Sequence, residues 1–359
     1  MNDNSQEPRR LDPSAVTDAV HHMSGEEGKA KIRLSALVSA IFRKHTEEEK
    51  EQVLTAGLAG HVPDERSMVP QWPRPWLYSR VFLWIFALAW FTYGLLYLTY
   101  NLYVTATLLL LAVSMFPLTM LFFFYECNIP RNISLTDSFI MLFVGGIISL
   151  LLSVVLGLLL PAELFTNTWY GAIVTGITEE LSMCLLIFWF IRRHKAKHLL
   201  TGLLIGACIG AGFCILENVG FLFNLSAESV YSEGGVYLNY FRPQLLSCWF
   251  LSFGSHTTWG ALTAAGIIAA KQDRSVTSEI LKSTYFLRFA LLALAFQILW
   301  RFPWPFDLDR IYTFVHLPVA VIGFALLIFQ ISAGLRQINR FRDQAWEKAA
   351  ETMALDDDE

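Results

Sequence analysis

The strongest constraint on this chain is a series of continuous apolar stretches between residues 78 and 335. A helix needs about 20 predominantly apolar residues to cross the hydrocarbon layer of a membrane. The stretches are apolar throughout and do not alternate, which excludes a membrane-spanning β-barrel. We therefore predict an all-α fold, a polytopic bundle of about eight transmembrane helices. The expected spans are 79–101, 104–126, 137–160, 169–191, 199–224, 245–270, 283–302 and 311–335.

The amino-acid composition agrees with a lipid environment. Hydrophobic residues make up 54% of the chain and charged residues only 16%, whereas about 25% charged residues is usual for soluble domains. The formal net charge of −4 gives no support for a nucleic-acid partner, which would require a basic surface. The chain is expected to be an integral, multi-pass membrane protein surrounded by membrane lipid.

Basic residues in the loops predict the orientation of the spans, since Lys and Arg in short loops favour the cytoplasm. They follow the fourth, sixth and eighth expected spans, at 192–197, 271–282 and 336–342. Both termini are therefore expected to be cytoplasmic. The predicted parts are an N-terminal cytoplasmic extension, helical or partly disordered (1–77), a transmembrane domain (78–335) and a charged cytoplasmic tail (336–359).

Two helix-start patterns occur in the extension. Ser24 followed by Glu27 is a capping box that predicts a helix. Thr46 followed by Glu49 predicts a second, short helix toward Gly57. The first helix is expected to carry an apolar face among lysines and arginines, formed by Leu34, Leu37, Val38, Ile41 and Phe42. Two interpretations remain open: a small helical extension in the cytosol, or a basic amphipathic helix on the inner leaflet.

Ionisable side chains inside the expected spans are few, and each is costly in lipid, so each is a candidate functional residue. Together with one neighbouring amide they are Glu179, Glu180, Glu217, Asn218, His256, Arg288 and His316. At about 1.5 Å per helical residue, Glu179, Glu217 and His256 lie about 15, 10 and 16 Å below the outer boundary. Three polar groups in one layer predict a shared, water-filled pocket. Arg288 lies near the cytoplasmic end and is expected to extend to the surface.

Small residues accompany these polar groups along the helix faces. One face of the fifth span carries Gly206, Gly210, Phe213 and Glu217, and one face of the sixth carries Ser252, His256, Gly260 and Thr263. The step from Gly206 to Gly210 allows two helix backbones to pack closely. The acidic and imidazole groups are therefore expected to face other helices. The alternative is a packing surface whose charged groups are satisfied by interhelical hydrogen bonds.

Adjacent carboxylates, a third carboxylate on a neighbouring helix and an imidazole suit the activation of water. A glutamate can act as a general base, and Glu and His together can bind a divalent metal that lowers the pKa of bound water. The sequence lacks the His-Glu-x-x-His and Gly-x-Ser-x-Gly patterns, and no aspartate lies within an expected span. These absences exclude zincin, serine-elbow and aspartyl designs and favour hydrolysis by buried glutamates.

Three short motifs resemble those of the PrsW family of intramembrane proteases. They are Glu179-Glu180, the segment 213–218 (Phe-Cys-Ile-Leu-Glu-Asn), and His256 followed by small residues to Gly266. The resemblance extends over roughly residues 120–335 and includes the segment 125–131 (Tyr-Glu-Cys-Asn-Ile-Pro-Arg). PrsW proteins are similar to CAAX-type prenyl proteases and to bacteriocin-processing proteases.

The resemblance implies an intramembrane endopeptidase that depends on glutamates or on a divalent metal such as zinc. It implies a single-pass membrane protein as substrate and a place in the bacterial inner membrane, since bacterial members make the first cut in membrane-anchored anti-sigma factors. Glu179 would be the water-activating base and Glu180 its supporting carboxylate. Glu217 and His256 would position the water, directly or as metal ligands, and Asn218 would orient Glu217.

Two positions depart from the family pattern. Met183 stands where a lysine commonly follows the paired glutamates, and Gln297 stands where a histidine is expected on the seventh span. Glutamine can form hydrogen bonds but is a poor zinc ligand, which makes His316 a candidate replacement. A second interpretation is therefore a catalytically lapsed relative that binds or senses single-pass helices. A proton-coupled transporter is a third, although no duplicated half with broken helices is visible.

Overall fold

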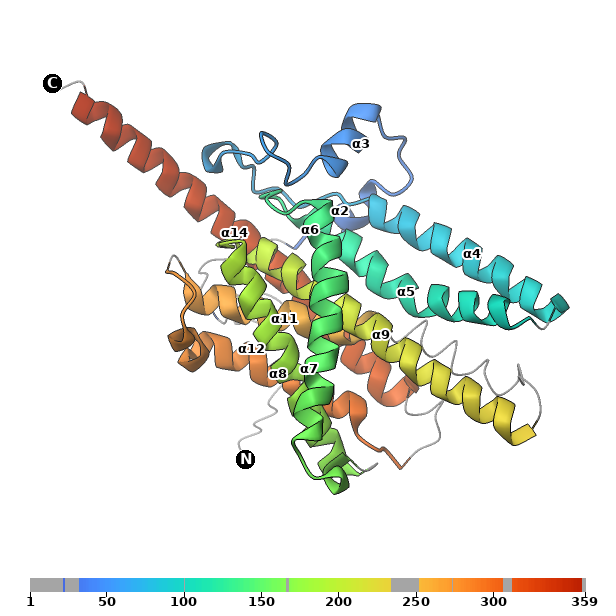
Figure 1. Cartoon of the computed structure of the whole chain (residues 1–359). Coiled ribbons are helices and arrows are strands. Elements are labelled where there is room, and N and C mark those ends of the chain that lie inside the picture. The colour runs from blue at the N-terminus through green and yellow to red at the C-terminus, as the bar shows by residue number, and fades with distance from the viewer. Residues whose placement is uncertain are drawn as a thin grey trace, which may run out of the picture.

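The computed structural model describes His22 and residues 32–99, 101–165, 168–233, 252–272, 274–305 and 312–356. All regular elements in these ranges are helical (Figure 1). The α-helices are α2 Leu34–Ser39, α3 Glu47–Leu54, α4 Leu77–Thr99, α5 Leu102–Cys127, α6 Leu135–Ile140, α7 Gly146–Leu158, α8 Trp169–Arg193, α9 Leu199–Glu233, α11 His256–Lys271, α12 Thr284–Arg301 and α14 Leu317–Asp356. Short π or 3-10 segments are Glu65–Ser67, Met141–Gly145, Ala162–Phe165, Ser252–Gly254, Ser278–Lys282 and Tyr312–His316.

Seven helices of the described part of the chain are long and apolar enough to cross a membrane, by length and composition. Each begins within three residues of an expected span. The third span consists of α6, the π segment and α7 in sequence. The sixth expected span, 245–270, is described from residue 252 onward and contains α11, a helix of 16 residues. The predicted all-α, polytopic helix bundle is confirmed.

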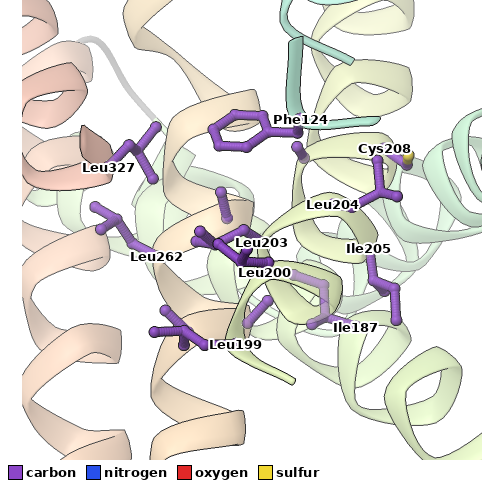
Figure 2. Packing of buried hydrophobic residues seen from close by; sticks show 14 of the residues in the cluster. Phe124, Ile187, Leu199, Leu200, Leu203, Leu204, Ile205, Cys208, Leu262 and Leu327 are labelled. Atoms are coloured by element: carbon purple, nitrogen blue, oxygen red, sulfur yellow. The ribbon is translucent and has the colours of Figure 1, made fainter. Parts of the chain in front are cut away.

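Helix α9 lies at the centre of the bundle. In its most apolar window 89% of the residues are buried, compared with 17% for α4 at the periphery. Leucines of α9 pack against Phe124 of α5, Ile187 of α8, Leu262 of α11 and Leu327 of α14 (Figure 2). A helix that is apolar on all sides is expected in such a position. The central place of α9 allows its single acidic position within the span, Glu217, to meet residues of several neighbours.

The predicted capping box at Thr46 is present. The Thr46 hydroxyl accepts a hydrogen bond from the Glu49 backbone, and the Glu49 carboxylate accepts one from the Thr46 backbone, at the start of α3. The chain then turns at Gly57, which has a φ of +77°. Its N–H donates to the Arg131 carbonyl oxygen at 2.8 Å, and a Cβ atom there would lie 2.2 Å from the carbonyl carbon of Ile133. Glycine is therefore required where the extension meets the bundle.

The first helix of the extension is shorter in the described residues than its apolar pattern predicts. Helix α2 ends at Ser39, so Ile41 and Phe42 lie beyond it and do not belong to its face. Leu37 is buried against the bundle, whereas Phe42 is almost fully exposed. The capping box expected at 24–27 lies outside the described residues.

Several contacts attach the extension to one end of the bundle. Glu126 of α5 accepts hydrogen bonds from the backbone N–H groups of residues 76–78 and so caps the start of α4. Lys197, between α8 and α9, forms an ion pair with Glu65. Helix α14 continues without a break past residue 335 and projects well beyond the bundle (Figure 1).

Candidate active site

Three side chains from three helices meet inside the bundle. Glu179 lies on α8, Glu217 on α9, and His256 is the first residue of α11. The Nε2 atom of His256 lies 2.8 Å from Oε2 of Glu217. One ligand atom from each residue lies within 4.8 Å of the other two. Residues that are far apart in the sequence therefore form one polar cluster, which we call the Glu-Glu-His cluster.

Close contact between α9 and α11 places His256 beside Glu217. A Cβ atom on Gly206 would lie 2.1 Å from the Gly260 carbonyl oxygen, and one on Gly210 would lie 2.0 Å from the His256 carbonyl oxygen. The two backbones are therefore in direct contact, as small residues one turn apart predict. Glu217 lies about two turns beyond Gly210 on the same face of α9.

The start of α11 is held by short polar and aromatic contacts. The Ser255 hydroxyl lies 3.0 Å from the Cys214 sulfur of α9 and donates to the Ser252 carbonyl oxygen at 3.1 Å. The rings of Phe213 and His256 lie with their centroids 4.4 Å apart. The expectation that Ser252 and His256 share one helix face is wrong, because Ser252 belongs to the 3-10 segment that precedes the helix. His256 is therefore fixed at a helix start.

Glu179 is buried and accepts hydrogen bonds from two residues of α12. Gln297 donates from Nε2 to Oε2 of Glu179. Arg301 donates from Nε to the same oxygen at 3.0 Å, and from Nη2 to Oε1. Helices α8 and α12 meet through side chains here, since a Cβ atom on Gly176 would first meet Cγ1 of Ile298 at 3.1 Å. Gln297, at the position where the resemblance implied a histidine, thus contacts the cluster through Glu179.

Arg301 is a residue of this site that the sequence motifs did not reveal. Its Nη2 atom also donates to Oε1 of Glu217, so the guanidinium bridges the carboxylates of α8 and α9. Its side chain is 31% exposed, compared with 8% for Glu179. One sequence feature could have pointed to Arg301. It lies at the end of the seventh span, at the opposite end from the basic loops, and arginine is uncommon on that side of membrane proteins. Arg301 also follows Gln297 by one helical turn.

Glu180 is adjacent to Glu179 but has a different environment. Its side chain is buried, and its Oε1 atom has no hydrogen-bond partner among the described residues. His256 and Glu179 both lie within electrostatic range of it. The Nδ1 atom of His256 and the Thr257 hydroxyl are also buried without a hydrogen-bond partner in the described part of the chain. Because such atoms cost free energy when unpaired, this region suits water or another polar ligand.

The Glu-Glu-His cluster fits a divalent metal by its donor set. Two carboxylates and one imidazole are ligands that zinc accepts, and a catalytic zinc keeps a further position for water. The ligand atoms already lie within 4.8 Å of one another, and unpaired polar atoms lie beside them. Glu179, Glu217 and His256 are therefore the residues that could hold such an ion.

The remaining candidate residues lie at other contacts. Asn218 donates from Nδ2 to the Cys214 carbonyl oxygen at 2.9 Å. The Nε2 atom of His316 lies 2.9 Å from the Trp300 carbonyl oxygen, and the two rings stack with centroids 4.3 Å apart. Met183 is fully buried in the apolar core, where a lysine would be costly. The structure thus brings Gln297 to the Glu-Glu-His cluster and places His316 against the backbone of α12.

Two open cavities lie beside the extension. One, of about 400 Å³, lies between Glu65 and α14. The other, of about 800 Å³, lies between the extension and the segment 125–131. Neither of these two cavities is lined by a residue of the Glu-Glu-His cluster.

Comparison with protein families supplies independent information on this arrangement. Residues 135–328 match the family model described as PrsW family intramembrane metalloprotease. This segment contains all three members of the Glu-Glu-His cluster and Glu180, and it covers more than half of the 359 residues. No curated protein and no solved structure gives a significant match.

Proposed function

The chain belongs to the PrsW family of intramembrane metalloproteases, and we propose that it hydrolyses a peptide bond of a membrane-anchored protein. The supporting observation is the Glu-Glu-His cluster, two carboxylates and an imidazole whose ligand atoms lie within 4.8 Å of one another inside an apolar bundle. Ionisable groups in a membrane domain are costly and are usually retained for a function. Peptide hydrolysis in a bilayer needs such groups to bind and activate water.

Glu179, Glu217 and His256 are the proposed ligands of a divalent metal such as zinc. When bound, such a metal polarises the scissile carbonyl group and lowers the pKa of bound water. The hydrogen bond from Gln297 limits the orientation of the Glu179 carboxylate. Side chains that bond to metal ligands from behind commonly have this effect. Asn218, tied to the Cys214 carbonyl oxygen, is proposed to limit the positions open to Glu217.

Glu180 is the proposed general base. Motif order favours Glu179 for this role, but both oxygens of Glu179 accept hydrogen bonds from α12, whereas Oε1 of Glu180 has no partner in the described residues. A buried carboxylate beside the cluster can take a proton from the attacking water and return it to the leaving amine. In a metal-free reaction Glu180 would perform the same two transfers, with His256 and Glu217 holding the water.

The proposed substrate is a single-pass membrane protein, such as an anti-sigma factor, in the bacterial inner membrane. An active centre within a membrane-spanning bundle is accessible to a transmembrane helix of another protein. We propose that both termini are cytoplasmic, because lysines and arginines follow the fourth, sixth and eighth spans. Lys197, in the first of these loops, forms an ion pair with Glu65 of the extension. The Glu-Glu-His cluster then lies in the outer half of the membrane.

A second candidate function is supported by two features of the cluster. Gln297 replaces a metal-binding histidine, and Arg301 already neutralises two of the carboxylates. These features favour a relative that has lost catalysis and binds or senses single-pass helices. The two candidates differ in whether a bound helix is cut.

The test is cleavage of single-pass reporter proteins reconstituted with the full-length chain in liposomes. We expect the wild type to cut at least one bacterial anti-sigma factor reporter and Glu180→Gln to be slower by about a hundredfold or more, the usual contribution of a general base. Glu163→Gln, an exposed glutamate between α7 and α8, is the matched control and should cut normally. Cleavage by Glu180→Gln at the wild-type rate would exclude Glu180 as the base, and binding without cleavage by the wild type would establish the lapsed relative.

A further inference from the structure

The guanidinium of Arg301 lies where two carboxylates of the Glu-Glu-His cluster converge. It donates to both oxygens of Glu179, through Nε and Nη2, and also to Oε1 of Glu217. Such paired, charge-assisted hydrogen bonds are stronger than neutral ones. Two acidic side chains in an apolar bundle would otherwise repel each other. Arg301 therefore supplies the positive charge that allows α8 and α9 to bring their carboxylates together.

The same carboxylates are two of the three groups that fit a metal. Both oxygens of Glu179 accept hydrogen bonds from Arg301, so any metal bound by Glu179 takes an oxygen that Arg301 uses. A divalent ion and a guanidinium only a few ångströms apart repel strongly where water is scarce. Arg301 and a metal ion therefore compete for the carboxylates of Glu179 and Glu217 in this arrangement.

Arg301 has a route out of the site. It is the last residue of α12, and the chain continues in an extended conformation at Phe302, with φ −62° and ψ 133°. Its side chain is 31% exposed, more than that of Glu217 at 25% or His256 at 3%. A long side chain at a helix end can reach the surface at low cost, because its charged group regains water there. The guanidinium can therefore leave while the helix stays in place.

We propose that Arg301 is a removable internal cation, which neutralises Glu179 and Glu217 while no metal is bound and competes with a metal for these two carboxylates. The inference rests on the metal-binding role proposed above for the Glu-Glu-His cluster. It adds a level of regulation, since the site changes from a closed, internally paired state to a metal-loaded state only when Arg301 moves away.

The test is metal binding by the full-length protein in detergent, purified with a histidine-free tag and stripped with a chelator. Titration with Co²⁺, followed by its visible absorption, gives the affinity of the wild type, Arg301→Gln and Arg301→Lys. We expect Arg301→Gln to bind Co²⁺ about tenfold more tightly than the wild type. Arg301→Lys, which keeps the charge but loses the forked geometry, should fall between them. Arg288→Gln removes an exposed arginine of the same helix and should leave the affinity unchanged.

A second measurement covers the case in which Arg301→Gln folds poorly without metal. We expect the metal-free variant to melt at a lower temperature than the wild type and Co²⁺ to raise its Tm by more than that of the wild type. The inference would be overturned if Co²⁺ bound Arg301→Gln no more tightly than the wild type and raised its Tm by no more, and also if none of these proteins bound Co²⁺. The Co²⁺ titration contains no substrate and is independent of the liposome assay, so tighter Co²⁺ binding by Arg301→Gln together with no reporter cleavage in liposomes would refute the peptidase and leave the role of Arg301 standing.

Discussion

Gly210 of α9 packs directly against the backbone of His256, so that a Cβ atom on Gly210 would lie 2.0 Å from the His256 carbonyl oxygen. Backbone atoms cannot move aside as the end of a flexible side chain can. The position of the imidazole relative to Glu217 therefore depends on the absence of a side chain at residue 210. This contact leads to the first prediction.

Replacing Gly210 with alanine should separate α9 from α11 and displace His256. We expect a loss of stability of about 1–3 kcal/mol, typical of overpacking, and a loss of reporter cleavage of about a hundredfold. Thermal unfolding in detergent and the liposome assay measure the two effects. The control is Gly220→Ala on the same helix, where a Cβ atom would meet nothing within 4 Å. Equal behaviour of the two variants would mean that the glycine contact does not position His256.

Glu126→Ala should loosen the start of α4. The variant removes the acceptor of three backbone N–H groups, from Trp76 at 2.8 Å and from Leu77 and Tyr78 at 2.9 Å. We expect a loss of about 1–2 kcal/mol, the usual value of a helix cap, and faster proteolysis near residue 76. Glu126→Gln keeps one acceptor oxygen and should therefore lose less stability than Glu126→Ala. Unchanged proteolysis and Tm in Glu126→Ala would contradict the capping role.

Acid should destabilise the protein through His198. Burial, and next the nearby charge of Lys197, lower the pKa of His198 from 6.5 to about 4, although Glu65 opposes this shift. Between these values the unfolded chain binds a proton that the folded chain does not, so the free energy of unfolding falls as the pH drops from 6.5 to 4. The full effect is on the order of 3 kcal/mol, and it is absent above pH 6.5.

The measurement is the Tm in detergent at pH 7.5 and pH 5.0. The difference between the two values should be smaller in His198→Gln than in the wild type, because the titrating group is gone. His61→Gln replaces an exposed histidine of the extension and should keep the wild-type difference. If His198→Gln and the wild type lose the same number of degrees, another group causes the acid sensitivity.

Gln297→His should improve the metal site. The amide of Gln297 donates to Glu179, and imidazole is a much better zinc ligand than an amide. We expect tighter Co²⁺ binding and faster reporter cleavage than in the wild type. Gln297→Leu, of similar size but without polar atoms, should show neither gain. A decrease in both quantities in Gln297→His would show that the hydrogen bond to Glu179 matters more than an additional ligand.

The sequence predicts the membrane helices well because their signal is local and strong. A span needs about 20 apolar residues, and the charged loops limit where it can begin and end. A close backbone contact on this face of α9 was also predictable, since Gly206 and Gly210 stand one turn apart. The depth of each residue along its span predicts that Glu179, Glu217 and His256 lie in one layer of the membrane. It does not predict the distances between their side chains.

Other features depend on packing that the sequence does not encode locally. The bridge formed by Arg301 requires a long side chain to reach two other helices, and its direction follows from how α12 packs against α8. The start of α11 at His256, by contrast, has a local signal, since Gly254 and the N-cap Ser255 directly precede it, and the prediction of one continuous span over 245–270 did not use that signal. The π segment Met141–Gly145 lies in a stretch that is apolar on every side, so no periodicity marks it.

The backbone contacts of Gly206 with Gly260 and of Gly210 with His256 also determine which parts of the bundle can move. Sliding α11 along α9 would press carbonyl oxygens into the opposite main chain, so these two helices behave as one stiff unit. The neighbouring contact of Gly176 involves the side chain of Ile298, which can change rotamer. The α8–α12 contact at Gly176 is therefore one that a rotamer change can loosen, whereas the backbone contacts of α9 with α11 hold His256 and Glu217 in register.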